Sequence, residues 1–177
     1  TEKGVQRAMD KIKALCTEPK GGCVFWSAGA QPPELLMSGE VVMATGWNGR
    51  FFNAIVGEGA PLVQVWDGQG LDYEYFVQVK GGPNDANGMA KKALAMMTST
   101  EMLAGSAKYI AYAPWRKSSI AVMEAGEPWY KDGKTNMVPQ MPTAPANTKN
   151  YFLVDPIFWA DNGTELGEKW EAMKAGL

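Results

Sequence analysis

The stretch that decides the fold runs from residue 39 to residue 52 and reads GEVVMATGWNGRFF. Its apolar run, Val41 to Ala44, predicts a strand buried on both faces of a parallel sheet. The run ends in a turn with two glycines, 46–49, where Asn48 is a good helix N-cap. Apolar residues then follow at helical spacing, namely Phe51, Phe52, Ile55 and Val56. A strand, a glycine turn and a helix in this order are typical of an α/β sheet, which binds ligands beyond the carboxyl ends of its strands.

Trp47 lies on this turn, at the end of the predicted strand. A large aromatic side chain in such a place can form a platform for a ligand. It can equally well cover the local hydrophobic core. The spacing of the residues alone favours neither interpretation.

The composition excludes several classes of function. The chain has 177 residues and a net charge of −2, so it lacks the basic surface that nucleic acids and anionic membranes attract. No apolar run reaches the roughly 18 residues that a membrane span requires. The sequence contains no histidine, which excludes Ser-His-Asp or Cys-His catalysis and imidazole-containing metal sites within this chain.

Periodicity along the rest of the chain predicts further helices and strands. We expect helices over 5–15, 86–97 and 118–125, a helix capped by Thr98, and a last helix from about Thr164. Short strands are expected at 23–26, 60–66 and 76–80. Residues 126–150 show no periodicity and contain four prolines. A connection of this length is usually functional or crosses between lobes.

The order of several short motifs resembles one protein family. The motifs are Gly39–Arg50, Glu58–Pro61, Lys80–Asn84, Tyr109–Tyr112 and Phe158–Asn162. Each is weak alone, but five in order at workable spacing are specific. Together they resemble the C-terminal half of the spermidine/putrescine-type substrate-binding proteins of bacterial ABC transporters.

The resemblance implies an α/β, type II periplasmic-binding-protein fold with two lobes, present here only in its C-terminal portion. Residues 1–71 and 124–177 would form most of the second lobe, and residues 72–123 a segment of the first. It also implies a location in the periplasm, or outside the cell on a membrane anchor. The expected partners are a small cationic amine and the membrane permease of the transporter, without a cofactor or a metal.

The resemblance also assigns roles to single residues. Trp47 matches a tryptophan that stacks on the polyamine chain, Glu74 an acidic residue that pairs with an ammonium group, and Tyr112 a cleft tyrosine. Two positions depart from the family pattern. Asp72 stands where a second cleft tryptophan is usual, and Ala160 where a glutamine is frequent. The added carboxylate of Asp72 favours a smaller or differently charged cation as the ligand.

An enzyme on an α/β scaffold is the alternative hypothesis. Asp72 and Glu74 would then act as an acid/base pair. The sequence has no nucleophile elbow, no glycine-rich phosphate loop and no CxxC motif. These absences favour a binding protein that performs no chemistry.

Two further expectations follow from the resemblance. Cys16 and Cys23 are the only cysteines and flank a turn rich in Pro and Gly, so an exported protein would join them in a disulfide; two buried free thiols are the alternative. The segment 72–123 would lack the N-terminal half against which it packs. Its apolar residues would then form an exposed patch, covered by that half, by self-association or by repacking onto the second lobe: Phe76, Val79, Leu94, Met97 and Leu103.

Overall fold

A computed structural model describes residues 1–17 and 22–177, which form two compact units. The first unit contains Thr1–Ala28 and Asp155–Leu177, and the second contains Gly29–Val154. These boundaries differ from those of the expected lobes, 1–71 with 124–177 and 72–123. The assignment of the chain to lobes therefore stays a prediction.

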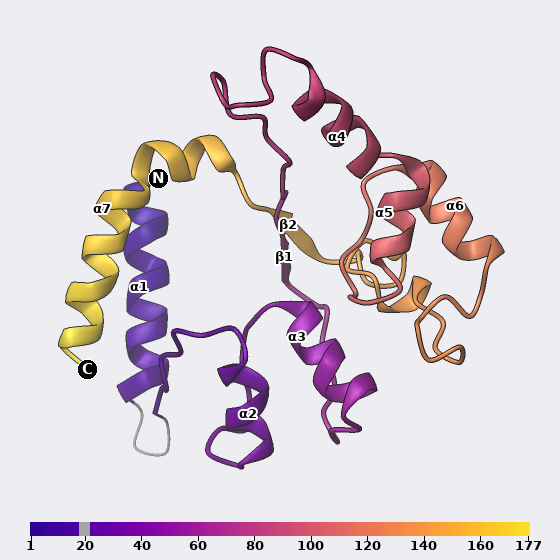
Figure 1. Cartoon of the computed structure of the whole chain (residues 1–177). Coiled ribbons are helices and arrows are strands. Elements are labelled where there is room, and N and C mark those ends of the chain that lie inside the picture. Colours follow the sequence, from indigo (N-terminus) through magenta and orange to yellow (C-terminus); the bar gives the residue numbers. More distant parts are fainter. Residues whose placement is uncertain (18–21) are drawn as a thin grey trace. The chain divides into compact units, whose positions relative to one another are not determined.

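The first unit is built on two helices that lie side by side, α1 (Glu2–Thr17) and α7 (Pro156–Ala175) (Figure 1). The apolar spacing that predicted a helix over 5–15 is confirmed by α1. Beside α7, the ring of Phe25 meets the edge of Trp170 with centroids 5.4 Å apart. The ammonium group of Lys174 lies 5.8 Å and 5.7 Å from the centroids of these two rings, within the range of a cation–π contact.

Helix α7 begins eight residues earlier than the predicted start at Thr164. Asp155 is its N-cap, and a carboxylate oxygen accepts hydrogen bonds from the backbone N–H groups of Ile157 and Phe158 at 2.9 and 3.1 Å. Pro156 occupies the first helical position, where its missing N–H is no loss. Asp155 and Pro156 therefore determine where α7 begins, although two glycines inside the helix lower its intrinsic stability.

The second unit packs short helices around a small core. The helices are α2 (Gln31–Met37), α3 (Asn48–Phe52), which continues as the π-helix η1 (Asn53–Gly57), α4 (Met89–Met97), α5 (Thr100–Ser106) and α6 (Lys117–Ala125). Alanines on and after α5 are fully buried, so the chain approaches closely there. Their neighbours in the core are Phe52, Met123, Tyr130, Met137 and Met141. Phe52 and Tyr130 meet edge to face, with centroids 5.1 Å apart.

The cap of α5 differs from the prediction. Ser99, rather than Thr98, is the N-cap, and its hydroxyl accepts a hydrogen bond from the N–H of Met102. Thr98 instead belongs to the end of α4, where its hydroxyl donates to the carbonyl of Leu94. Both residues have hydroxyl side chains that could cap α5. The hydroxyl of Thr98 is already hydrogen-bonded to the end of α4, so Ser99 caps α5 instead.

The irregular region 126–150 is held by amide side chains. The Gln69 Nε2 donates to the carbonyl oxygens of Pro142 and Asn147 at 2.9 and 2.7 Å. The Asn147 Nδ2 donates to the carbonyls of Pro139 and Met141 at 3.0 and 2.8 Å. The short 3-10 helix η2 (Val138–Gln140) lies within this region. Side chains thus satisfy backbone carbonyls that have no partner in a regular element.

The strands differ most from the prediction. The described residues contain two, β1 (Gln69–Leu71) and β2 (Tyr151–Leu153), which pair in parallel with Gln69 opposite Tyr151 (Figure 1). The expected strands at 23–26, 41–44, 60–66 and 76–80 are not paired into a sheet. Val42 and Met43 are 92% and 85% exposed, so the interpretation of 41–44 as a strand buried on both faces is wrong for this structure. An apolar pattern indicates an extended segment, but a strand also needs a partner for its backbone groups.

No helix in the described ranges is long and apolar enough to cross a membrane. Likewise, these ranges hold no group of three or more acidic or cysteine side chains placed to bind a metal ion.

Cys16, near the end of α1, and Cys23 are joined by a disulfide in the structure. Most of the predicted turn between them falls on residues 18–21, which lie outside the described residues.

We expect no titratable thiol in the unfolded, unreduced chain, because both sulfur atoms are used in this bond. After reduction, the same titration should find two thiols, and a Cys16→Ser variant should show one thiol without reduction. Two free thiols before reduction would show that the cysteines are unpaired in the protein.

Candidate functional site

The predicted turn at Trp47 is held against a segment distant in sequence. Trp47 is the residue before α3, in an extended conformation, and Asn48 is the first residue of the helix. Asn48 therefore is not the N-cap, as the sequence suggested. Its side-chain Nδ2 instead donates to the carbonyl oxygen of Ala111 at 2.6 Å. This hydrogen bond joins residues 63 positions apart and fixes the turn beside Tyr112.

Glycine at position 49 permits a close approach between the turn and Tyr112. A Cβ atom at Gly49 would lie 2.8 Å from a ring carbon of Tyr112 and 2.9 Å from the side chain of Ile110. Both distances are shorter than a van der Waals contact allows, so only glycine fits without a shift. The aromatic ring of Tyr112 consequently packs against the first turn of α3.

A second glycine accommodates the ring of Trp47. A Cβ atom at Gly29 would overlap the six-membered ring of Trp47 and would lie 3.4 Å from the Nε of Arg50. Trp47 and Arg50 are three residues apart at the start of α3, so their side chains lie on the same side of the helix. Trp47 is 55% exposed.

Glu74 and Arg50 both act electrostatically on Tyr112. Burial raises the pKa of the Tyr112 phenol above its ordinary value near 10, the charge of Glu74 raises that pKa further, and the charge of Arg50 lowers it. The structure thus brings Tyr112 near a carboxylate and a guanidinium at once. Because its pKa is raised, the phenol stays protonated and keeps its O–H as a hydrogen-bond donor.

Asp72 is placed differently from Glu74. One of its carboxylate oxygens accepts a hydrogen bond from the N–H of Tyr73 at 2.7 Å, which is a local contact. The rings of Tyr73 and Tyr75 stack with centroids 6.2 Å apart, and Tyr73 also stacks on Trp115 at 4.4 Å. The stacking places Tyr73 and Tyr75 on one side of this segment. No contact places Asp72 with Trp47 or Tyr112 in the described part of the chain.

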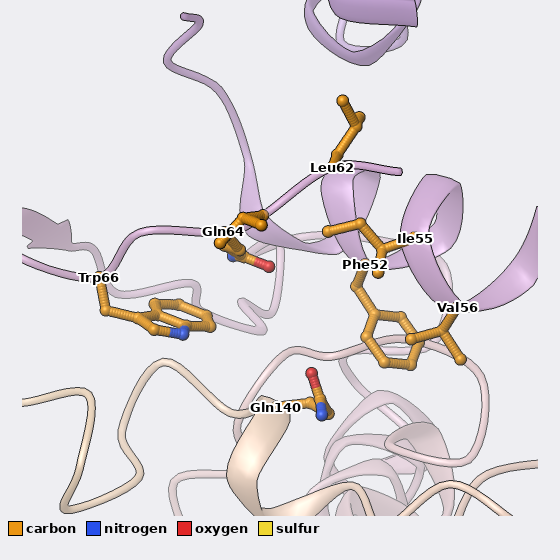
Figure 2. A pocket seen from close by; sticks show the side chains of 8 residues that line it. Phe52, Ile55, Val56, Leu62, Gln64, Trp66 and Gln140 are labelled. Atoms are coloured by element: carbon orange, nitrogen blue, oxygen red, sulfur yellow. The ribbon is translucent and has the colours of Figure 1, made fainter. Parts of the chain in front are cut away.

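A separate cavity of about 250 Å³ lies elsewhere in the second unit (Figure 2). It is lined mainly by apolar side chains of α3, η1 and the following segment, together with two glutamines: Phe52, Ile55, Val56, Leu62, Val63, Gln64, Trp66 and Gln140. None of the four residues predicted to bind the ligand lines it. Lacking a charged group, it suits an ionic ligand less well than the surroundings of Trp47 do.

Arg50 was not among the residues predicted from the sequence to bind the ligand. Its signal was present, because the predicted helix start places residues 47 and 50 on one side of the first turn. Trp47 was expected to bind a cationic ligand, and a positively charged side chain such as Arg50 was not expected beside it. Trp47 and Arg50 both lie near Gly29, Tyr112 packs on Gly49, and the charges of Glu74 and Arg50 act on the phenol of Tyr112. We call these four residues the Trp47 cluster.

We expect the pKa of Tyr112 to depend on both charged neighbours. Replacing Glu74 by Gln should lower this pKa, because the nearby negative charge disfavours the phenolate, and replacing Arg50 by Gln should raise it. Phenolate absorbance, titrated in each variant with and without Tyr112→Phe, isolates this one tyrosine. An unchanged pKa in the Glu74→Gln variant would show that the carboxylate is not near the phenol.

Comparison with known proteins adds three relatives. The gamma-aminobutyric acid-binding protein of Pseudomonas aeruginosa PAO1 is 37% identical over 175 residues, covering 99% of this chain and 45% of that protein. The crystal structure of the periplasmic binding protein MotA of A. tumefaciens B6 in complex with glucopine is 26% identical, with a TM-score of 0.74, over 98% of this chain and 49% of that one. An ABC transporter substrate-binding protein of Bradyrhizobium japonicum USDA 110 is 24% identical, with a TM-score of 0.72, over 96% and 48%.

These matches confirm the predicted fold class, a partial periplasmic-binding-protein fold of mixed α/β type. The chain spans about half the length of the relatives that it matches. The predicted location in the periplasm or outside the cell and the expected lack of catalysis agree with the family as well. The family model of the bacterial extracellular solute-binding proteins matches residues 1–142, and this chain belongs to that family.

Proposed function

We propose that this chain supplies one wall of the binding site in the solute-binding component of an ABC importer. The ligand is a small solute with an ammonium group, and a membrane permease receives it. The single observation that supports the proposal is the Trp47 cluster, in which a carboxylate and a guanidinium act on one neutral phenol and the guanidinium lies beside an aromatic ring, in a chain of this family. One similar structure is named as an ABC transporter substrate-binding protein, which supports a permease as partner.

The charges of the cluster favour a ligand of mixed charge. The carboxylate of Glu74 suits an ammonium group, and the ring of Trp47 suits an alkyl chain or a cation. Arg50 suits a carboxylate, to which it can donate two parallel hydrogen bonds, and the protonated phenol of Tyr112 can donate a further one. An ω-amino acid has both ends. Gamma-aminobutyric acid is of this type, and one relative is named for binding it.

A di- or polyamine such as putrescine or spermidine is the second candidate. It follows from the sequence resemblance, and Trp47 and Glu74 suit it equally well. Asp72, two residues before Glu74, is a second carboxylate that could hold a second ammonium group. Arg50 separates the two candidates, because a guanidinium repels a second ammonium group and attracts a carboxylate.

We expect gamma-aminobutyric acid to bind the chain more tightly than putrescine does. NMR titration of the labelled chain detects even the weak binding that one wall of a site gives. Arg50→Gln should weaken binding of the amino acid about tenfold or more and leave putrescine binding unchanged or stronger, whereas Glu74→Gln should weaken both.

The matched controls for this titration are Lys149→Gln and Glu40→Gln, exposed charges in the same unit and outside the cluster. They should leave both affinities unchanged. Tighter binding of putrescine, with Arg50→Gln neutral, would favour the polyamine instead. Tight binding of an anion or a neutral sugar, with both amines inert, would reject the function proposed for the cluster.

Trp47→Ala should weaken binding of the preferred amine by roughly 2 kcal/mol, or about thirtyfold, because it removes the ring that covers the alkyl chain. Trp47→Phe keeps an aromatic surface and should lose less. Calorimetry or NMR titration of both variants measures the difference. An alanine variant that binds as tightly as the parent chain would mean that Trp47 only covers the local core.

A further inference from the structure

Three asparagines of the chain are each followed by glycine, and in this pair the asparagine side chain can react with the backbone. The backbone nitrogen of the glycine attacks the side-chain carbonyl carbon, and a glycine has no Cβ atom to hinder the approach. The residue pair is the same in all three places, so the fold decides which of them reacts. The three pairs are Asn48–Gly49, Asn87–Gly88 and Asn162–Gly163.

Asn48 is protected by the contacts that hold the turn at Trp47. Its Nδ2, the nitrogen that would leave as ammonia, donates to the carbonyl oxygen of Ala111 at 2.6 Å. The next residue is tightly packed, since a Cβ atom at Gly49 would lie 2.8 Å from the ring of Tyr112. Asn48 and Gly49 also begin α3, and ring closure would require both to leave the helical conformation.

Asn162 is protected by the helix that contains it. It lies within α7, which is 20 residues long, and its Nδ2 donates to the carbonyl oxygen of Phe158 at 2.8 Å. Inside an α-helix each backbone N–H is hydrogen-bonded to the carbonyl four residues earlier. The nitrogen of Gly163 is therefore engaged, and its attack on the side chain would break the helix.

Asn87 lies in an exposed turn before α4 and has none of this protection. Gly88 has a φ of 73°, the left-handed conformation that glycine adopts without steric cost. Apart from Gly88 and its chain neighbours, no described atom lies within 4 Å of where its Cβ would be. The Nδ2 of Asn87 makes a contact of 3.4 Å with the Oδ1 of Asn84, which is long for a hydrogen bond and holds the leaving nitrogen weakly.

The side chain of Asn87 is already folded over the bond that would be attacked. Its Oδ1 accepts a hydrogen bond from the backbone N–H of Met89 at 3.0 Å. The ring of atoms that this hydrogen bond closes contains both the side-chain carbonyl carbon and the nitrogen of Gly88. As that nitrogen adds to the carbon, negative charge develops on Oδ1, where the N–H of Met89 stabilises it.

One hydrogen bond of the turn opposes the reaction. The N–H of Gly88 donates to the carbonyl oxygen of Asp85 at 3.2 Å and must be released before the nitrogen can attack. A hydrogen bond in an exposed turn opens at a lower free energy than one inside a helix. Release is therefore easier at Gly88 than at Gly163.

We propose that Asn87 is a site of spontaneous covalent modification, at which deamidation proceeds ahead of Asn48 and Asn162. The bond from the nitrogen of Gly88 to the side-chain carbonyl carbon forms, and the bond from that carbon to Nδ2 breaks. Gly88 loses its amide proton to the solvent, and Nδ2 leaves as ammonia, which gives a cyclic imide. Water then opens the imide at either carbonyl, giving aspartate or isoaspartate. Water is the only co-reactant, and nothing is oxidised or reduced.

The two products act differently on α4. Aspartate at position 87 keeps an oxygen that can accept from the N–H of Met89, and its charge is favourable near the start of a helix. Isoaspartate inserts a methylene group into the backbone ahead of α4 and displaces that acceptor. In both products the chain gains one negative charge, so the acidic fraction of the protein increases with its age.

The test is incubation of the folded 177-residue chain in mildly alkaline buffer, followed over time by peptide mapping with mass spectrometry. In water enriched in heavy oxygen, each conversion places a labelled oxygen in the new carboxyl group and so dates it to the incubation. We expect Asn87 to convert about tenfold or more faster than Asn48 and Asn162. In denaturant, where the fold no longer distinguishes them, the three should convert at similar rates. A folded chain in which Asn87 stays intact, or in which Asn48 or Asn162 keeps pace with it, would overturn the proposal.

Variants of the turn identify the product. Asn87→Gln keeps an amide but lengthens the side chain, and it should remove the first acidic form that ion exchange separates. Asn87→Asp should elute with that form from the start. The matched control is Asn84→Gln, because Asn84 is an exposed asparagine of the same turn that no glycine follows. It should leave the acidic form in place, and its disappearance in this control would assign the reaction to Asn84 instead.

Met89→Pro tests the hydrogen bond to Oδ1. Proline suits the first position of a helix, so α4 should persist, which circular dichroism checks. Without the N–H donor, conversion of Asn87 in the folded chain should slow about threefold or more, relative to the same variant in denaturant. Faster conversion would mean that the hydrogen bond restrains the side chain, and would overturn its assisting role. None of these measurements uses a ligand, so they are independent of the function proposed for the Trp47 cluster.

Discussion

The candidate site depends on the hydrogen bond from the side chain of Asn48 to the carbonyl of Ala111. It joins two segments that are far apart in sequence, and Gly49 allows them to approach until Tyr112 packs on α3. Without this contact the phenol would have no reason to lie near Arg50, and its charge environment would change. The side-chain amide of Asn48 thus holds the turn with Trp47 and Arg50 beside the segment of Tyr112. Glu74 comes from a third stretch of the chain.

Local sequence patterns located most of the helices, but they misplaced the start of α7 and the N-caps of α3 and α5. They failed for the strands because an apolar run such as 41–44 specifies an extended shape, whereas pairing depends on a neighbour that the run does not contain. They also failed for β2, since Tyr151–Leu153 has no alternation and is placed only by its pairing with β1. Within the site, Asn48 was given a local role as a cap, and its actual acceptor lies 63 residues away.

The region 126–150 shows how a segment without periodicity still folds. The side-chain amides of Gln69 and Asn147 each donate to two backbone carbonyl groups. These hydrogen bonds take the place of the backbone hydrogen bonds of a helix or sheet. The indole N–H of Trp129 donates to the carbonyl oxygen of Ala104 at 2.9 Å and so attaches this region to α5. The sequence could indicate that these residues were polar or aromatic. It could not indicate which distant carbonyls they would satisfy.

The raised pKa of Tyr112 has a consequence for how the Trp47 cluster behaves in its surroundings. Fluids outside the cytoplasm vary in acidity, and histidine is the side chain whose ordinary pKa makes it sensitive to that variation. This chain contains no histidine, and the phenol remains a donor well beyond neutral pH. A wall built in this way presents the same hydrogen-bond donors in mildly acidic and mildly alkaline fluid. Under the proposed function, the binding of a solute to this cluster should therefore change little over this range of pH.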